Sequence, residues 1–428
     1  MGLNDDAWER LFDKYPILHE VETQGKYIIS AKQIKEFREP RLMTKFDHKL
    51  NLPAVFRDNS LSILPLSRGS YVISSFEAYK EFEEPAAGAQ LVSIPGCLQS
   101  LMPQFLTSEA IALHCAGACG ILEDFLEEEW LVPTVSGQMG SGVFSFAINA
   151  AAGPQQVAVS SAQIEIDAAY EGAGSLSLFE AKNSLSKDFL IRQLYYPFRT
   201  WSARITKPVK TVFLVFSNGR FCLYQYSFVD PGNYNSLQLV KQKNYQIATK
   251  ISLSDIESLL AQTALLQEPE IPFPQADSMA RIINMLELLS QRPMTAGDIT
   301  SRYLFESRQT NYYTDAGRYL GLIRKEEREN RGVLYHLTQE GSRIMSLAHK
   351  ERQLALAGQI LEHGVFHETL RLCLGRGKVP DRKEIVEIME ALGAYHVYAS
   401  STYFRRASTV ASWIHWILSI IETERYRL

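Results

Sequence analysis

Two short apolar segments that end in acidic residues place the strongest constraint on how this chain can fold. Residues 163–167 read Gln-Ile-Glu-Ile-Asp, and residues 177–182 read Ser-Leu-Phe-Glu-Ala-Lys. Two glycines between them predict a hairpin or short loop that sets the segments side by side as strands. Side chains two positions apart share one face of a strand, so Glu180 and Lys182 project together. The sequence therefore predicts that Asp167, Glu180 and Lys182 converge where two strands end.

These residue types suit the chemistry of phosphodiester cleavage. Two carboxylates without a nearby histidine or cysteine form a hard oxygen site, which suits a Mg²⁺ ion that keeps several waters and binds substrate phosphate. An ammonium beside the metal can help to deprotonate the attacking water and can balance charge on phosphorus. The pattern Glu-x-Lys also occurs by chance on solvated strand faces. Both segments are apolar up to their acidic ends, which favours a site at the mouth of a core.

The next segment adds a third element. Residues 187–201 predict a helix that brings Arg192 and Gln193 near the acids. An Asp, a Glu-x-Lys and a helix with Gln-Leu-Tyr-Tyr resemble the PD-(D/E)xK nuclease superfamily. The stretch from about residue 107 to 245 resembles the type II restriction endonucleases of that group.

The resemblance implies an α/β (α+β) core in which a mixed central sheet is flanked by helices. It further implies that Asp167 and Glu180 ligate Mg²⁺, that Lys182 serves the attacking water, and that Gln193 supports the site. The chain departs from the family pattern in one respect, because Ile166 stands where a proline precedes the aspartate in the motif.

Many members of the superfamily also carry an acid on the helix before the first core strand. Residues 107–129 predict such a helix, and both Glu109 and Glu123 lie on it. The sequence leaves these two candidates open.

Composition fits an intracellular enzyme with several domains. A chain of 428 residues exceeds what one hydrophobic core usually organises, so two to four domains are expected. No apolar run reaches the roughly eighteen residues of a membrane span, and the amino terminus lacks the features of a signal peptide. Five scattered cysteines predict a reducing compartment, so we expect a cytoplasmic protein. The net charge of −4 requires any contacts with DNA phosphates to come from a localised face.

His114, Cys115 and Cys119 invite a zinc interpretation. They lie at helical spacing with apolar neighbours, and no second pair of ligands follows, so the sequence favours core packing over a metal site.

Changes in composition along the chain predict five segments. They are an N-terminal α+β region of unclear role that could contact DNA, a nuclease domain, a proline-rich linker, a winged helix-turn-helix and a second, helical, winged-helix-like domain. Their expected bounds are 1–90, 91–265, 266–276, 277–347 and 348–428.

The predicted winged helix rests on three helices and a hairpin. Residues 279–290 and 307–320 predict helices, and Thr295 caps another between them. A charged hairpin is predicted over residues 325–337. In such modules the third helix enters the major groove and the wing touches the backbone or the minor groove. The expected contacts to double-stranded DNA are Arg308, Gln309, Asn311, Tyr312 and, on the wing, Arg331.

The tail is expected to repeat this plan. Residues 359–374 and 381–392 predict helices, and a polar, doubly basic segment from residue 401 precedes an apolar helical body. Winged helices also mediate protein contacts, so DNA binding by this part depends on the nuclease assignment. Its expected phosphate or guanine contacts are Arg405, Arg406, Ser408 and Thr409.

Together these features predict a Mg²⁺-dependent type II restriction-like endonuclease, a hydrolase that cuts double-stranded DNA at a specific sequence. Cutting both strands needs two active sites, which predicts a homodimer whose two-fold symmetry matches a palindrome. Two alternatives stay open. One is a winged-helix regulator with a degenerate nuclease core, which binds DNA without cutting it. The other is a repair nuclease that acts on ends or branches without a fixed sequence.

Overall fold

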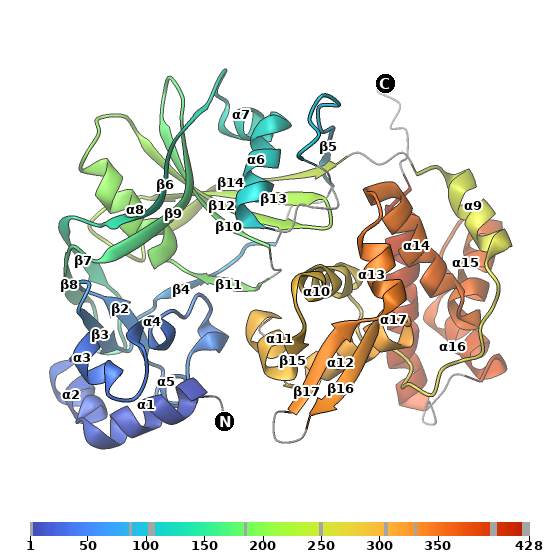
Figure 1. Cartoon of the computed structure of the whole chain (residues 1–428), viewed down its shortest axis with the longest axis horizontal. Coiled ribbons are helices and arrows are strands. Elements are labelled where there is room, and N and C mark those ends of the chain that lie inside the picture. The colour runs from blue at the N-terminus through green and yellow to red at the C-terminus, as the bar shows by residue number, and fades with distance from the viewer. Residues whose placement is uncertain are drawn as a thin grey trace. The chain divides into compact units, whose positions relative to one another are not determined.

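The computed structural model describes residues 3–84, 88–101, 108–183, 186–247, 251–303, 307–328, 332–393 and 400–421. They form a mixed α/β protein with two compact units (Figure 1). Unit 1 comprises Met1–Val92, Ser108–Phe216 and Arg220–Gln246. Unit 2 comprises Ser93–Thr107, Ser217–Gly219 and Ile247–Leu428. The division is coarser than the five segments expected from the sequence.

The N-terminal part of unit 1 surrounds a small sheet with helices. Its three antiparallel strands have the order β1-β3-β2. Apolar side chains such as those of Trp8, Phe56 and Ile73 form a core of their own. The elements are α1 (Leu3–Lys14), α2 (Ile17–Gln24), β1 (Tyr27–Ser30), α3 (Ala31–Lys35), α4 (Pro40–Met43), a 3-10 helix (Lys49–Asn51), α5 (Ala54–Asp58), β2 (Ser62–Pro65) and β3 (Ser70–Ser74).

The remainder of unit 1 is built on a seven-stranded sheet of order β5-β14-β13-β12-β10-β9-β6. Strands β10 and β12 are parallel, whereas β9 is antiparallel to β10 and to β6, so the sheet is mixed, as predicted. The elements are β4 (Tyr79–Glu81), β5 (Gln90–Val92), α6 (Glu109–Ala118), α7 (Ile121–Leu126), β6 (Val132–Gly140), β7 (Val143–Ile148), β8 (Gln155–Ser160), β9 (Gln163–Glu171), β10 (Leu176–Lys182), β11 (Asp188–Leu190), α8 (Arg192–Ser202), β12 (Val209–Ser217), β13 (Arg220–Phe228) and β14 (Leu237–Ile247).

Helix α8 is the crossover that two parallel neighbours require. It packs against β9 and β10. Tyr195 and Tyr196 are completely buried there, in one core with Leu178. The Tyr195 hydroxyl donates a hydrogen bond to the carbonyl of Pro231 (2.7 Å), and the Tyr196 hydroxyl donates to that of Pro65 (3.0 Å). The helix is therefore fixed on the sheet.

The helix predicted over residues 187–201 is wrong in its first part. Asp188–Leu190 is strand β11, antiparallel to β4, and the helix begins only at Arg192. Phe189 is completely buried in the core, and the backbone around it pairs with a strand distant in sequence. Tertiary pairing overrides the local helical pattern here.

The single helix predicted over residues 107–129 is interrupted. Gly120 has a φ of +69°, a left-handed conformation that glycine adopts without strain, and it separates α6 from α7.

Unit 2 begins with helices around a three-stranded antiparallel sheet of order β15-β17-β16. The predicted helices and hairpin are present, and Thr295 Oγ1 accepts a hydrogen bond from the Asp298 N–H (3.1 Å), as a helix cap does. The elements are α9 (Leu253–Gln262), α10 (Met279–Gln291), β15 (Met294–Thr295), α11 (Ala296–Tyr303), α12 (Ser307–Tyr319), β16 (Ile323–Arg328) and β17 (Gly332–Leu337).

The described residues of the tail, where the sequence predicts a second winged-helix-like domain, are helical. Between residue 338 and residue 421, the described residues contain helices and no strand. One core unites Ile283 and Tyr319 with Phe366 and Trp413. The helices are α13 (Gln339–Met345), α14 (His349–Leu361), α15 (Gly364–Arg376), α16 (Arg382–Ala391) and α17 (Ser400–Ser419).

The boundary expected at residue 265 also differs from the structure. Ile256 and Leu260 of α9 pack in the core of unit 2, although the sequence assigns them to the nuclease domain. The helices of the described residues are all too short or too polar to cross a bilayer.

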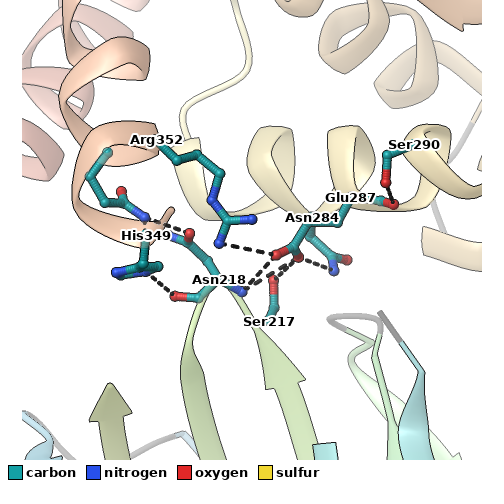
Figure 2. Close-up of polar contacts among 8 residues, drawn as sticks. Ser217, Asn218, Asn284, Glu287, Ser290, His349 and Arg352 are labelled. Atoms are coloured by element: carbon teal, nitrogen blue, oxygen red, sulfur yellow. Dashed lines mark hydrogen bonds and ion pairs between the residues drawn. The ribbon is translucent and has the colours of Figure 1, made fainter. Parts of the chain in front are cut away.

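The turn between β12 and β13, Ser217–Gly219, belongs to unit 2. Figure 2 shows the polar contacts of Ser217 and Asn218. The Asn218 N–H donates to Oε1 of Glu287 on α10 (3.2 Å), and the Ser217 hydroxyl donates to Oε2 of the same side chain (3.1 Å). Asn218 has a φ of +50°, which asparagine tolerates better than most residues.

Helix α14 completes this cluster. Gln353 Nε2 donates to Oδ1 of Asn218 (2.6 Å), and His349 Nε2 lies 3.2 Å from the Asn218 carbonyl oxygen. Arg352 approaches Glu287 to 3.9 Å. The turn is therefore held by a buried polar network of unit 2.

Candidate active site

Asp167 lies where β9 parts from β10. The paired residues of the two strands end at Ala168 and Phe179, immediately before the acids. Beyond that point the Ala181 N–H donates to Oδ2 of Asp167 (2.8 Å), so a carboxylate replaces the carbonyl of a neighbouring strand. The separation of the strands therefore sets the Asp167 carboxylate against the backbone of β10.

Glu180 and Lys182 lie on one face of β10, as strand periodicity predicts. Lys182 Nζ is 2.6 Å from Oε1 of Glu180. The Gln193 amide, in the first turn of α8, donates to the same oxygen (2.5 Å). Only 10% of the Glu180 side chain and 14% of the Lys182 side chain are exposed. The structure therefore brings together Asp167, Glu180, Lys182 and Gln193.

Several acids act electrostatically on the single ammonium of Lys182. Burial alone lowers the pKa of Lys182, but attraction by Glu180, Asp47, Glu109 and Asp167 outweighs burial and raises the pKa above its usual value. The lysine is therefore an ammonium ion that faces several acids.

The pKa of Glu180 responds to the same surplus of acids. Burial raises its pKa to about 8, and Asp167 and Asp47 add to the increase, whereas Lys182 opposes it. A carboxyl group with a raised pKa takes up a proton more readily than an ordinary glutamate, unless a cation arrives.

Asp47 was not predicted from the sequence. It lies in the N-terminal part of unit 1, and it is close enough to act electrostatically on both Glu180 and Lys182. Its Oδ1 is buried and has no hydrogen-bond partner in the described part of the chain. The backbone explains its position, since the Leu190 N–H in β11 donates to the Asp47 carbonyl (3.0 Å). No pattern in the sequence links residues so far apart.

Of the two helix acids that the sequence left open, Glu109 is the one near the site. It contributes to the electrostatic attraction on Lys182. Glu123 instead acts on Tyr170, whose pKa is raised mainly by burial and further by this acid. The difference follows from the break at Gly120, which directs α6 and α7 differently.

A hollow opens beside Glu180, between β9, β10 and α8. It contains both acidic and apolar side chains, and Glu165 at its rim is 3.9 Å from Lys45. Its lining consists of Glu165, Ile166, Leu178, Phe179, Glu180, Gln193, Leu194 and Pro197. The acids therefore adjoin a concave surface of unit 1.

Within the described residues, no group of three or more His, Cys, Asp or Glu side chains is gathered closely enough to hold a metal ion. A cation at this place would have Asp167 and Glu180 as direct carboxylate ligands, and it would take the others from water and substrate. Oδ1 of Asp167 and Oε2 of Glu180 are the oxygens not used in the bonds described above.

The residues that the sequence predicts to contact DNA lie in unit 2, and they differ in how exposed they are to solvent. On α12, Asn311 is exposed, whereas Gln309 and Tyr312 are half-buried. The side chain of Arg308 and the whole of Arg331 lie outside the described residues.

The four residues of α17 that are predicted to contact DNA also differ in exposure. Arg405 is exposed and Ser408 is half-buried, with its hydroxyl donating to the Phe404 carbonyl (3.3 Å). Arg406 is only 6% exposed. Thr409 is 2% exposed, so its expected contact with DNA is wrong for this structure. The apolar helical body that the sequence predicted begins earlier than expected and includes Thr409.

Three consecutive stretches of the chain match family models, and each model is described as a domain of unknown function. They are DUF6996 over residues 5–73, DUF6997 over residues 74–246 and DUF7226 over residues 281–422. No curated protein and no solved structure matches the chain. The second stretch contains Asp167, Glu180, Lys182 and Gln193, whereas Asp47 lies in the first.

Proposed function

We propose that this protein is a Mg²⁺-dependent endonuclease that hydrolyses phosphodiester bonds of double-stranded DNA, in the manner of type II restriction enzymes of the PD-(D/E)xK group. The observation that carries the proposal is the meeting of Asp167, Glu180 and Lys182 where β9 and β10 separate, with Lys182 Nζ 2.6 Å from Glu180. A solvated Glu-x-Lys on a strand face would not be buried beside a second acid.

The residues fit a divalent cation. Oδ1 of Asp47 and Oε1 of Gln193 are buried without a hydrogen-bond partner among the described residues, so the polar groups of the site are incompletely satisfied. The donor set consists of oxygens, which Mg²⁺ prefers, and Asp167 and Glu180 would hold the ion. When bound, Mg²⁺ supplies Lewis-acid polarisation of the phosphate and of an attacking water. A cation would also neutralise the acidic excess that helps to raise the pKa of Glu180.

The chain's own groups have distinct parts in this proposal. Lys182 stays protonated, since the surrounding acids raise its pKa. Its contribution is therefore to orient the attacking water and to balance charge on phosphorus, rather than to remove a proton. Gln193 positions Glu180 by donating to Oε1, and α8 holds the amide in place through its buried tyrosines.

DNA recognition is assigned to unit 2. The element order α10-β15-α11-α12-β16-β17, with a sheet of order β15-β17-β16, is the one expected of a winged helix. In that arrangement α12 would enter the major groove and the β16–β17 hairpin would act as the wing. Asn311 on α12 is exposed, as a base contact requires. A homodimer would present two active sites to the two strands.

The test is digestion of supercoiled plasmid with Mg²⁺ or with EDTA, followed by sequencing of the ends. Wild-type protein should cut only with Mg²⁺ and leave ends with a common sequence. Glu180→Gln should not cut. Glu171→Gln should cut normally, because Glu171, at the end of β9 and away from the site, makes an ion pair of comparable length with Lys207 (2.7 Å).

Each alternative has its own outcome. Cutting with random ends would replace the restriction assignment by a repair nuclease. Sequence-specific binding without any cutting would indicate a regulator with an inactive core. Equal cutting by wild type and Glu180→Gln would show that cleavage does not take place at this site.

A further inference from the structure

Helix α17 carries two adjacent arginines in opposite environments. Arg405 is exposed, whereas Arg406 is 6% exposed. Nε and Nη1 of Arg406 are buried and have no hydrogen-bond partner within the described residues. Burial of a cation without a partner is costly, because the group loses its water without gaining a counter-charge. The position therefore requires an explanation.

The described surroundings of Arg406 offer little compensation. Residues 400–419 of α17 contain no aspartate or glutamate. Burial and the neighbouring Arg405 lower the pKa of Arg406 to about 10, against the opposing effect of Tyr312 on α12. The guanidinium is thus in a desolvated place with a second cation beside it and a tyrosine hydroxyl nearby. Such a place favours an anion.

We propose that Arg406, with Arg405 and Tyr312, forms a binding site for a backbone phosphate of nucleic acid held by unit 2. A guanidinium donates charge-assisted hydrogen bonds to phosphate, and a buried setting strengthens them. The inference rests on the proposed function, because it gives α17 a part in holding the same duplex.

The site would position the duplex rather than recognise bases. A side chain that is 6% exposed cannot extend into a groove, which removes the guanine contact considered for Arg406 on the sequence. Tyr312 lies next to Asn311, the exposed residue of α12. A phosphate held by Arg406 would therefore fix the strand beside the helix that is proposed to read bases.

The test measures duplex binding by fluorescence anisotropy in EDTA, so that cleavage has no part in the result. Arg406→Met should weaken binding at least about tenfold, equally for different sequences, and should reduce the slope of log affinity against log salt by about 0.9. Arg406→Lys should keep the slope and lose part of the affinity. The control is Arg371→Met on α15, since Arg371 is exposed and paired with Glu368 (2.6 Å). It should bind as wild type.

A second measurement separates binding from a structural role. If Arg406 is an unpaired buried cation, Arg406→Met keeps or raises the melting temperature, and inorganic phosphate raises that of wild type more than that of the variant. An unfolded Arg406→Met protein, or unchanged duplex affinity and salt slope, would overturn the inference. A response to inorganic phosphate without any binding of duplex would also overturn it, because the ligand would then be a free anion.

These results are independent of cleavage. Arg406-dependent binding by a protein that never cuts would remove the nuclease and keep the phosphate site. If Arg406→Met binds duplex normally and still cuts it, the nuclease assignment is kept and the phosphate site is removed.

Discussion

The balance of charge around Lys182 is the residue-scale feature on which the account depends. Asp47, Glu109, Asp167 and Glu180 all act on this one ammonium. One lysine cannot neutralise several acids. Burial, together with Asp167 and Asp47, therefore raises the pKa of Glu180 to about 8 although Lys182 is beside it. The site is therefore complete only when a proton or a cation joins it.

A prediction of stability against pH follows from Glu180. Its pKa is higher in the folded protein, about 8, than the ordinary value of 4.5. The stabilisation from the bound proton is therefore fully present below about pH 4.5 and is lost as pH rises through 8. Without divalent cations, the melting temperature of wild type should fall more between pH 6 and pH 9 than that of Glu180→Gln. Adding Mg²⁺ should restore the melting temperature of wild type at pH 9.

Glu171→Gln is the control for this measurement, because 37% of the Glu171 side chain is exposed. It should follow wild type at every pH. Parallel curves for wild type and Glu180→Gln would show that Glu180 is already ionised, and the charge argument would fail.

The elements divide into those that local patterns predict and those that tertiary contacts decide. Strand alternation was enough to predict β9 and β10 and the convergence of Asp167, Glu180 and Lys182. It did not predict β11, because β11 is defined by pairing with β4. It also gave no indication of Asp47, which reaches the site through a backbone hydrogen bond from Leu190.

The same contrast holds for the helices. Amphipathic spacing and the Thr295 cap predicted α10, α11 and α12. Spacing alone gave no reason to expect that α14 to α17 share their core rather than repeat their plan, because the apolar faces of these helices do not reveal which partner covers them. Glu109 and Glu123 were equivalent in sequence, and only the turn at Gly120 distinguishes them.

The ion pair between α10 and α14 supports a second prediction. Glu287 and Arg352 have 16% and 3% of their side chains exposed, and Glu287 also accepts hydrogen bonds from the turn at Ser217 and Asn218. Removing one partner of a buried pair costs about 3–5 kcal/mol. Glu287→Ala should therefore lower the unfolding midpoint of unit 2 in urea markedly.

Its control is Glu327→Ala on β16, which removes a pair between Lys325 and an exposed carboxylate (3.0 Å). The control should leave the midpoint almost unchanged. Equal effects of the two substitutions would mean that the Glu287 network adds nothing to stability.

At the scale of the whole molecule, the chain has separate cores in its two units. Domains with their own cores often unfold in separate steps, so calorimetry should resolve more than one transition. Mg²⁺ should raise only the transition of unit 1, since a ligand stabilises the unit that binds it. Glu287→Ala should lower only the transition of unit 2. One transition that responds to both changes would contradict this division.

The central claim is that the buried lysine among these acids belongs to a phosphodiesterase site. Its most direct test is the single-turnover rate of duplex cleavage with Mg²⁺ by Lys182→Ala and by Lys207→Ala. Both lysines pair with a glutamate, at 2.6 Å and 2.7 Å, but only Lys182 lies beside Asp167 and Glu180. The account predicts that Lys182→Ala lowers the rate at least about a hundredfold and that Lys207→Ala leaves it within about twofold. Equal rates for the two variants, or no cleavage by wild type on any duplex, would contradict it.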